Sequence, residues 1–180
     1  SNPDSDAVNI REELGFSKED IIVLFIARLT YQKDPLTFVN AAKLVLDKNP
    51  DIKFLIIGEG ELKDKCIELS KTLGIFDKLK FLLFRQDVKN ILHSVDIFVL
   101  PSKWEVVPLA LLEAMSMKKA CIATDIKGTN EALKNNFNGY MFPVGNFVEL
   151  AGKISELAVN KELRIKFGEE ARNTVVREFD

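Results

Sequence analysis

Two glutamates near the middle of the chain, Glu105 and Glu113, have the residue type and setting for chemistry on a polar ligand. Glu105 precedes a predicted helix, and Glu113 lies inside it among leucine, alanine and methionine, so Glu113 needs a polar partner if it is buried. A ribose diol would serve, because a carboxylate can accept both hydroxyl hydrogens; a solvated outer helix face is the alternative. Eight residues of helix span about 12 Å, more than the roughly 5–9.5 Å between paired glycosidase carboxylates. We therefore expect the two glutamates to touch different parts of one long ligand.

Two cations, Arg28 and Lys33, share the loop that directly follows the first apolar run. They stand five residues apart and can hold a diphosphate, the guanidinium as a planar fork and the ammonium as a point charge. Ordinary ion pairs on a surface loop are the alternative, and the spacing alone leaves both open.

Gly58 and Gly60 follow the second apolar run and precede a predicted helix. Glycines at this place let a ligand approach the backbone and leave the helix N-terminus open to an anion or a ring. Lys63 stands where the dinucleotide-binding fingerprint needs its third glycine, and the motif follows the second strand rather than the first. The pattern therefore argues against a nicotinamide site.

The remaining polar residues at strand ends favour structural roles. Asp87 is predicted to cap a short helix that carries the single histidine, His93, as a packing residue. Thr129, with Glu131 and Ala132 after it, is predicted to begin another helix. The charged segment 11–20 is predicted to be a solvated helix and turn.

The few histidine and cysteine residues argue against a metal site or a thiol-based reaction. One histidine, with Cys66 and Cys121 far apart and without CxxC spacing, argues against a zinc cluster, a disulfide framework and a histidine-based nucleophile relay. Asp4-Ser5-Asp6 has the form of a metal-binding DxD, but it precedes every predicted strand and is expected to be a flexible tail. The Ser1-Asn2 start is interpreted as an expression scar, so we expect a piece of a longer protein.

Length and composition indicate what must position these residues. The chain has 180 residues, of which 47% are hydrophobic and 29% charged, so it can form one domain with a buried core. A net charge of −2 argues against nucleic acid as a partner. The longest apolar run, Ile21–Ala27, has seven residues, too few to span a bilayer, and no secretory leader is visible.

The hydrophobic pattern predicts a parallel sheet covered by helices. Nearly continuous apolar runs are typical of strands buried on both faces, and they alternate with segments of helical period. The predicted strands are Ile21–Ala27, Lys53–Gly58, Leu79–Phe84, Val95–Leu100, Lys119–Thr124 and Gly139–Phe142. The predicted longer helices are Leu36–Asn49, Glu61–Leu73, Pro108–Met117, Asn146–Val159 and Lys161–Arg177. This order predicts a doubly wound α/β fold, Rossmann-like with about six strands, whose ligands bind at the carboxyl ends of the strands.

The order of motifs resembles the C-terminal half of a GT-B glycosyltransferase, in the retaining "group 1" family, glycosyltransferase family 4. The resemblance covers nearly the whole chain, and its most specific mark is the glutamate pair with seven residues between. The matching segments are Ala27-Arg28-Leu29 with Lys33, Ile57-Gly58-Glu59-Gly60, Phe84-Arg85-Gln86-Asp87-Val88, Pro101-Ser102 with Glu105 and Glu113, Ala123-Thr124-Asp125 with Gly128 and Glu131, and Asn138-Gly139 before Pro143-Val144-Gly145.

The resemblance implies a role for the charged residues. Arg28 and Lys33 would hold the diphosphate of a nucleotide-sugar donor and, with Glu105, form the catalytic set. Glu105 would contact hydroxyls of the transferred sugar, and Glu113 would contact the nucleotide ribose.

The resemblance also implies donor contacts through the backbone. The segment around Arg85 would meet the base, amides near Val107 and Leu109 would face phosphate, and Gly58 and Gly60 would border the donor.

Five positions depart from the family pattern. Ala27, Leu83, Val106 and Lys127 stand where the family often has glycine, and Pro108 offers no N–H to a donor. Val106 bears most on the site, because a β-branched residue at positive φ would be strained and would displace Glu105.

The resemblance implies two domains in the intact protein: residues 1–20 as a tail and short helix, residues 21–180 as the nucleotide-sugar-binding domain, and an acceptor-binding N-terminal domain missing from this chain. The expected activity is retaining transfer from a UDP- or GDP-sugar in polysaccharide or glycoconjugate synthesis, with no metal or cofactor and with an unknown acceptor. A non-catalytic nucleotide-binding module and a GT-B sugar-nucleotide epimerase are the alternatives. The expected location is the cytoplasm, with any membrane contact made by the missing domain.

Overall fold

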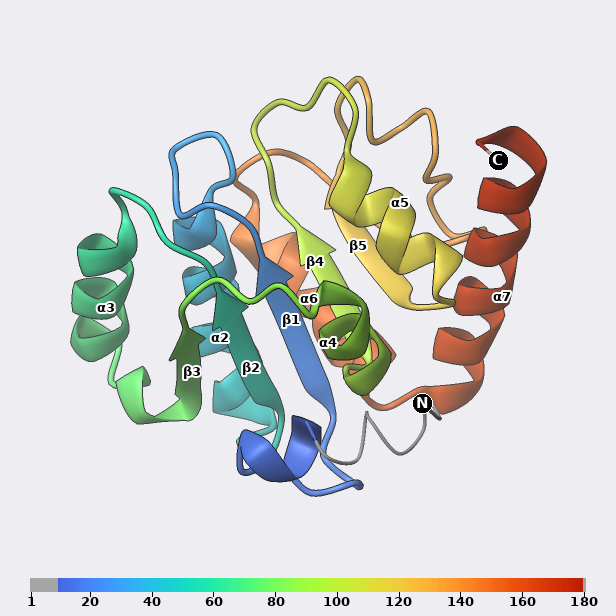
Figure 1. The fold of residues 1–180 in the computed structure, drawn as a ribbon. Helices are drawn as coiled ribbons and strands as arrows, with labels where there is room; N and C mark the ends of the chain where they lie inside the picture. The colour runs from blue at the N-terminus through green and yellow to red at the C-terminus, as the bar shows by residue number, and fades with distance from the viewer. Residues whose placement is uncertain (1–9, 180) are drawn as a thin grey trace.

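The computed structural model describes residues 10–179, so the Ser1-Asn2 start and the Asp4-Ser5-Asp6 motif lie outside the described residues. Within this range six parallel strands form one sheet in the order β3-β2-β1-β4-β5-β6 (Figure 1). The strands are β1 (Ile22–Ile26), β2 (Lys53–Ile57), β3 (Leu79–Leu82), β4 (Ile97–Leu100), β5 (Ala120–Thr124) and β6 (Tyr140–Phe142). This confirms the predicted Rossmann-like α/β fold, with each strand inside its predicted range.

Helices cover both faces of the sheet (Figure 1). They are α2 (Pro35–Lys48), α3 (Lys63–Thr72), α4 (Val88–Ser94), α5 (Leu109–Ser116), α6 (Phe147–Ala158) and α7 (Lys161–Glu178), with a 3-10 turn η1 (Phe76–Lys78) before β3. Alternate residues of β1 point into two separate cores: Val23 and Phe25 pack with α2 and α6, whereas Leu24 packs with α4 and α5. Both sheet faces are therefore buried, which explains the continuous apolar runs.

One predicted helix is absent. Residues 127–132 form consecutive turns, and the hydroxyl of Thr129 donates to the carbonyl oxygens of Thr124 (2.5 Å) and Ile126 (3.0 Å). Threonine side chains that bond to nearby backbone compete with helix formation. The segment thus remains a loop that returns the chain to β6.

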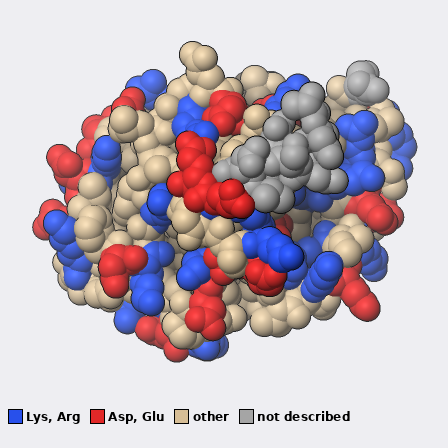
Figure 2. Space-filling view, turned by 60° about the horizontal axis from the view of Figure 1, so that its bottom comes forward, with Lys and Arg blue, Asp and Glu red and all other residues tan. Residues whose placement is uncertain are grey.

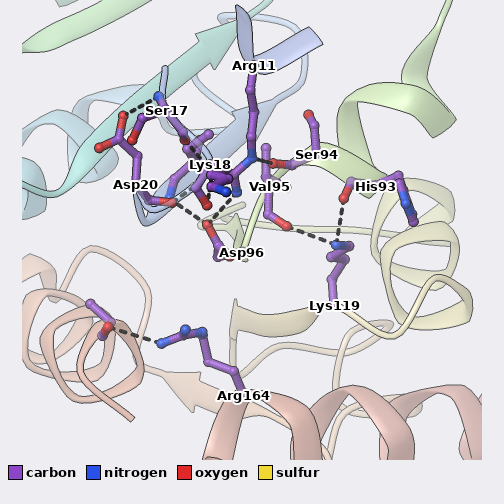
Figure 3. Close-up of polar contacts among 12 residues, drawn as sticks. Arg11, Ser17, Lys18, Asp20, His93, Ser94, Val95, Asp96, Lys119 and Arg164 are labelled. Atoms are coloured by element: carbon purple, nitrogen blue, oxygen red, sulfur yellow. Dashed lines mark hydrogen bonds and ion pairs between the residues drawn. The ribbon is translucent and has the colours of Figure 1, made fainter. Parts of the chain in front are cut away.

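Arg11 holds the end of the sheet at which the strands begin; most of segment 11–20 is exposed, as predicted, but this side chain is largely buried. The Arg11 side chain is 12% exposed and pairs with Asp96 at 3.0 Å. It also donates to the carbonyl oxygens of Ser94 (2.9 Å), Ser17 (2.9 Å) and Asp20 (2.9 Å) (Figure 3). Residues 10–13 are helical, and these bonds fasten them to the start of β1 and β4.

The surface at this end carries both signs of charge. Figure 2 shows this end of the molecule, where acidic and basic side chains are interspersed among uncharged ones. Among the helices of residues 10–179, none is long and apolar enough to cross a membrane.

Candidate functional site

The candidate site lies at the carboxyl ends of β1 and β4, the two central strands of the sheet. The chain leaves β1 toward α2 on one face and leaves β4 toward α5 on the other. Two neighbouring parallel strands with connections to opposite faces leave a crevice at their carboxyl ends, the usual ligand site of such sheets. The loops that border it are residues 27–34 and 101–108.

Lys33 and Glu105, both predicted from the sequence, meet across this crevice. Lys33 Nζ lies 2.6 Å from Glu105 Oε1, although the residues are 72 positions apart in the chain. The Glu105 side chain is 5% exposed and that of Lys33 25% exposed. Ser102 Oγ donates to the same carboxylate oxygen at 2.8 Å, and Thr124 Oγ1 donates to the Ser102 carbonyl at 2.6 Å. The carboxylate is thus aimed and charge-balanced before any ligand binds.

Three further residues join the two loops and were not singled out from the sequence. The Gln32 side chain donates to the Trp104 carbonyl (2.9 Å), and the Lys103 N–H donates to the Gln32 carbonyl (2.7 Å). Lys103 Nζ also pairs with Asp34 Oδ2 at 2.9 Å. Asp34 carried a signal that could have found it, because it directly precedes the proline at the first position of α2, where a capping side chain is expected.

Arg28, Gly58 and Gly60 border an open pocket of about 400 Å³ between the ends of β1 and β2, together with the exposed ring of Phe84. The Arg28 side chain is exposed and has no hydrogen-bond or ion-pair partner among residues 10–179, so it is open to an anion. Lys33 is not in this pocket: the structure brings Lys33 to Glu105 rather than to Arg28.

The two glycines also have a structural role, and their predicted contact with a donor stays a prediction. A Cβ on Gly58 would overlap the Ala27 carbonyl oxygen, and one on Gly60 would lie 2.5 Å from the Leu29 carbonyl oxygen. The close neighbour is therefore the chain's own loop 27–29. Because the two glycines have no side chain, that loop packs closely against the end of β2 and forms part of the pocket wall.

Arg85 is occupied by carboxylates. Its guanidinium donates to both oxygens of Asp87 (2.9 and 2.8 Å) and to both oxygens of Glu13 (3.2 and 3.1 Å). Hydrogen bonding to Arg85 lowers the pKa of Asp87. Asp87 stands at the N-cap of α4 but makes no capping bond, so its predicted role as a side-chain cap is wrong: Arg85 takes the oxygens that capping would use.

Glu113 lies on α5, half-buried, and its carboxylate has no partner among residues 10–179. The two predicted alternatives, a ribose partner and a solvated helix face, both stay predictions. The amides predicted to face phosphate differ from each other: the Leu109 N–H donates to the Val107 carbonyl (2.9 Å), whereas the Val107 N–H has no protein acceptor among the described residues.

Val106 does not distort the loop. It is 86% exposed and is absent from the non-glycine residues with positive φ, so Glu105 keeps its place without strain at its neighbour. Gly128 supports this loop from the end of β5, because a Cβ there would lie 2.8 Å from the Glu105 carbonyl oxygen. The packing therefore requires glycine at position 128, whereas the exposed position 127 tolerates a lysine.

Two observations limit where a ligand can bind and which groups can hold it in the described part of the chain. A hollow of about 470 Å³ at the opposite edge, between Gly15 and the starts of β2 and β3, contains none of the candidate residues. No group of three or more histidine, cysteine or carboxylate side chains within residues 10–179 is arranged to hold a metal ion. What the site offers a ligand is cations, one buried carboxylate and backbone amides.

Comparison with known proteins identifies the family. Residues 6–174 match the family described as "Glycosyl transferases group 1". The chain belongs to this family. It is 35% identical over 170 residues to the UDP-Gal:alpha-D-GlcNAc-diphosphoundecaprenol alpha-1,3-galactosyltransferase of Escherichia coli, a match that covers 93% of this chain and 44% of that protein.

Solved structures share the fold. Staphylococcus aureus TarM, crystallised with UDP, superposes with a TM-score of 0.86 at 29% identity over 89% of this chain and 33% of that one. The C-terminal domain of the Francisella tularensis group 1 protein LpcC superposes with a TM-score of 0.85 at 24% identity, covering 100% of this chain and 94% of that domain. The chain therefore has the fold of a GT-B C-terminal domain, and it spans less than half the length of the E. coli relative.

Proposed function

We propose that the chain is the donor-binding half of a retaining glycosyltransferase, which takes a sugar from a UDP- or GDP-sugar for polysaccharide or glycoconjugate synthesis. The observation that carries the proposal is the Lys33–Glu105 pair at the crevice between β1 and β4. These are the two positions to which the family pattern gives the donor diphosphate and the transferred sugar. The rest of the enzyme, with the acceptor site, lies in a domain that this chain does not contain.

In the proposed reaction the anomeric C–O bond breaks, and its electron pair goes to the departing diphosphate. Lys33 exchanges its bond to Glu105 for a phosphate oxygen, and the unpaired Arg28 binds the same diphosphate. Fixed cations aimed at the charge that develops there stabilise the transition state more than the ground state. Released from Lys33, the Glu105 carboxylate accepts hydroxyl hydrogens of the sugar. The acceptor oxygen forms its bond to the anomeric carbon on the face from which the diphosphate departs, and the acceptor's hydroxyl proton passes to the departing diphosphate oxygen.

Uracil is the base we expect first. A mutant of TarM was crystallised in complex with UDP, and the E. coli relative is named for a UDP-sugar donor. Phe84 and Arg28 border the same pocket, and Arg85 directly follows Phe84 in the chain. A base in this pocket would therefore lie close to the arginine that binds its diphosphate.

Calorimetry of the 180-residue chain with UDP, GDP and ADP tests the proposal. Arg28→Ala and Lys33→Ala are each expected to weaken diphosphate binding about 10- to 100-fold, because a hydrogen bond to a charged group contributes roughly 1.5–3 kcal/mol. An exposed lysine on α3, Lys71→Ala, is the matched control and is expected to change nothing. Unchanged affinity in both loop variants would remove the phosphate site.

The two glutamates separate the parts of the donor. Glu113→Gln is expected to weaken UDP itself, since the ribose belongs to donor and product alike. Glu105→Gln is expected to leave UDP binding intact or tighter, because it releases Lys33, and to weaken the sugar-bearing donor. Glu169→Gln, exposed on α7, is the control. Equal losses for both ligands in both variants would contradict the assignment.

A further inference from the structure

Asp34 has an unusual conformation for a residue with a side chain. Its φ of 52° and ψ of 58° lie in the left-handed region, and the residue is 4% exposed. It caps α2, with Oδ1 accepting from the Thr37 N–H (3.2 Å) and Oδ2 from the Thr37 hydroxyl (2.6 Å). Asparagine would cap as well and tolerates this conformation. Capping therefore does not account for the negative charge.

The charge has a partner on the opposite loop. Lys103 Nζ lies 2.9 Å from Asp34 Oδ2, and the side chains of Lys103 and Asp34 are 22% and 5% exposed. The same ammonium lies 4.6 Å from the centre of the Tyr31 ring, and the Lys103 N–H donates to Gln32. Lys103 thus contacts three residues of the loop that carries Lys33, and its own carboxylate partner is the neighbour of Lys33.

Two neighbouring ion pairs therefore join the two loops: Lys33 with Glu105, and Asp34 with Lys103. We propose that Asp34 and Lys103 are positioning residues, whose ion pair holds Lys33 and Glu105 at the spacing that a nucleoside diphosphate and its sugar require; this rests on the proposed function. Donor binding opens the Lys33–Glu105 pair, because Lys33 then binds a phosphate oxygen and Glu105 binds sugar hydroxyl groups. The Asp34–Lys103 pair makes no such exchange and keeps the loops in register while the first pair is open.

A measurement without ligand tests whether this pair joins the loops. Asp34→Asn keeps the cap and removes the charge, so it is expected to fold. Amide exchange followed by NMR should be about tenfold faster at position 103 in Asp34→Asn and in Lys103→Met, because local opening of the loop contact exposes that N–H. Lys43→Met, which removes the exposed Lys43–Asp47 pair on α2, is the control and should leave the exchange unchanged. Unchanged exchange in Asp34→Asn would overturn the proposal.

UDP binding then tests whether the pair acts through Lys33. Asp34→Asn and Lys103→Met should each weaken UDP binding about five- to tenfold when Lys33 is present. In a chain that also carries Lys33→Met, each should weaken UDP binding less than about twofold, since the effects of coupled residues are not additive. Lys103→Arg should retain the wild-type affinity. Equal losses in both backgrounds would show that Lys103 does not position Lys33. If the wild-type chain fails to bind any nucleoside diphosphate, the proposed function falls, and the exchange measurement still decides whether the pair joins the loops.

Discussion

Replacing Gly60 with alanine is expected to destabilise the chain and to disturb the pocket beside Arg28. Gly60 has a φ of 155°, and an added Cβ would lie 2.5, 2.8 and 2.9 Å from the carbonyl oxygen, carbonyl carbon and nitrogen of Leu29. All three are backbone atoms of a fully buried residue, so no side chain can turn away. Leu29 must move, and its bonds to the Glu59 carbonyl (2.8 Å) and from the Leu62 N–H (2.9 Å) weaken with it.

The expected cost follows from these contacts. Backbone strain at a disfavoured φ contributes about 1–3 kcal/mol, and each weakened hydrogen bond contributes about 0.5–1.5 kcal/mol. The free energy of unfolding should therefore fall by about 2–6 kcal/mol, which lowers the Tm by roughly 4–24 °C at this chain length.

Thermal unfolding followed by circular dichroism provides the assay, with Gly152→Ala as the matched control. Gly152 is exposed on α6, and a Cβ added there would meet no heavy atom within 4 Å, so alanine should raise stability by about 0.5–1 kcal/mol. If Gly60→Ala unfolds at the wild-type temperature or above it, the close approach of loop 27–29 to the end of β2 is wrong.

Two other substitutions test the charged contacts. Arg85 lowers the pKa of Asp87, so their bond stabilises the fold above the carboxyl's usual pKa and is lost as the pH falls through the depressed folded value. The stability difference between wild type and Arg85→Met, measured by urea unfolding, should therefore shrink between about pH 5 and pH 2, and a constant difference would contradict the assignment. Arg11→Met leaves the Asp96 carboxylate unpaired and should cost about 2–4 kcal/mol in the same assay. Arg177→Met, whose side chain is 62% exposed, should cost less than about 0.5 kcal/mol, and equal costs would refute the structural role of Arg11.

The sequence by itself determined the sheet, the helices and the edge at which the ligand is expected to bind. Burial on both faces imposes continuous apolar runs on β1 and β4, and burial on one face imposes the helical period of α2, so these patterns are local and readable. The motif order also pointed to Lys33, Glu105 and Glu113, because the family resemblance ties residue types to positions along the chain.

Only the tertiary structure decided which side chains meet. Lys33 reaches Glu105 because β4 lies next to β1 in the sheet, an adjacency that no local pattern encodes. Arg85 binds Asp87, its near neighbour in the chain, but its second carboxylate partner is Glu13, 72 positions away. Asp34 could be read as a cap, yet its pairing with Lys103 depends on two loops that come together only in the folded sheet. Periodicity reports what is buried, whereas the choice among competing polar partners depends on distances that exist only once the strands are ordered.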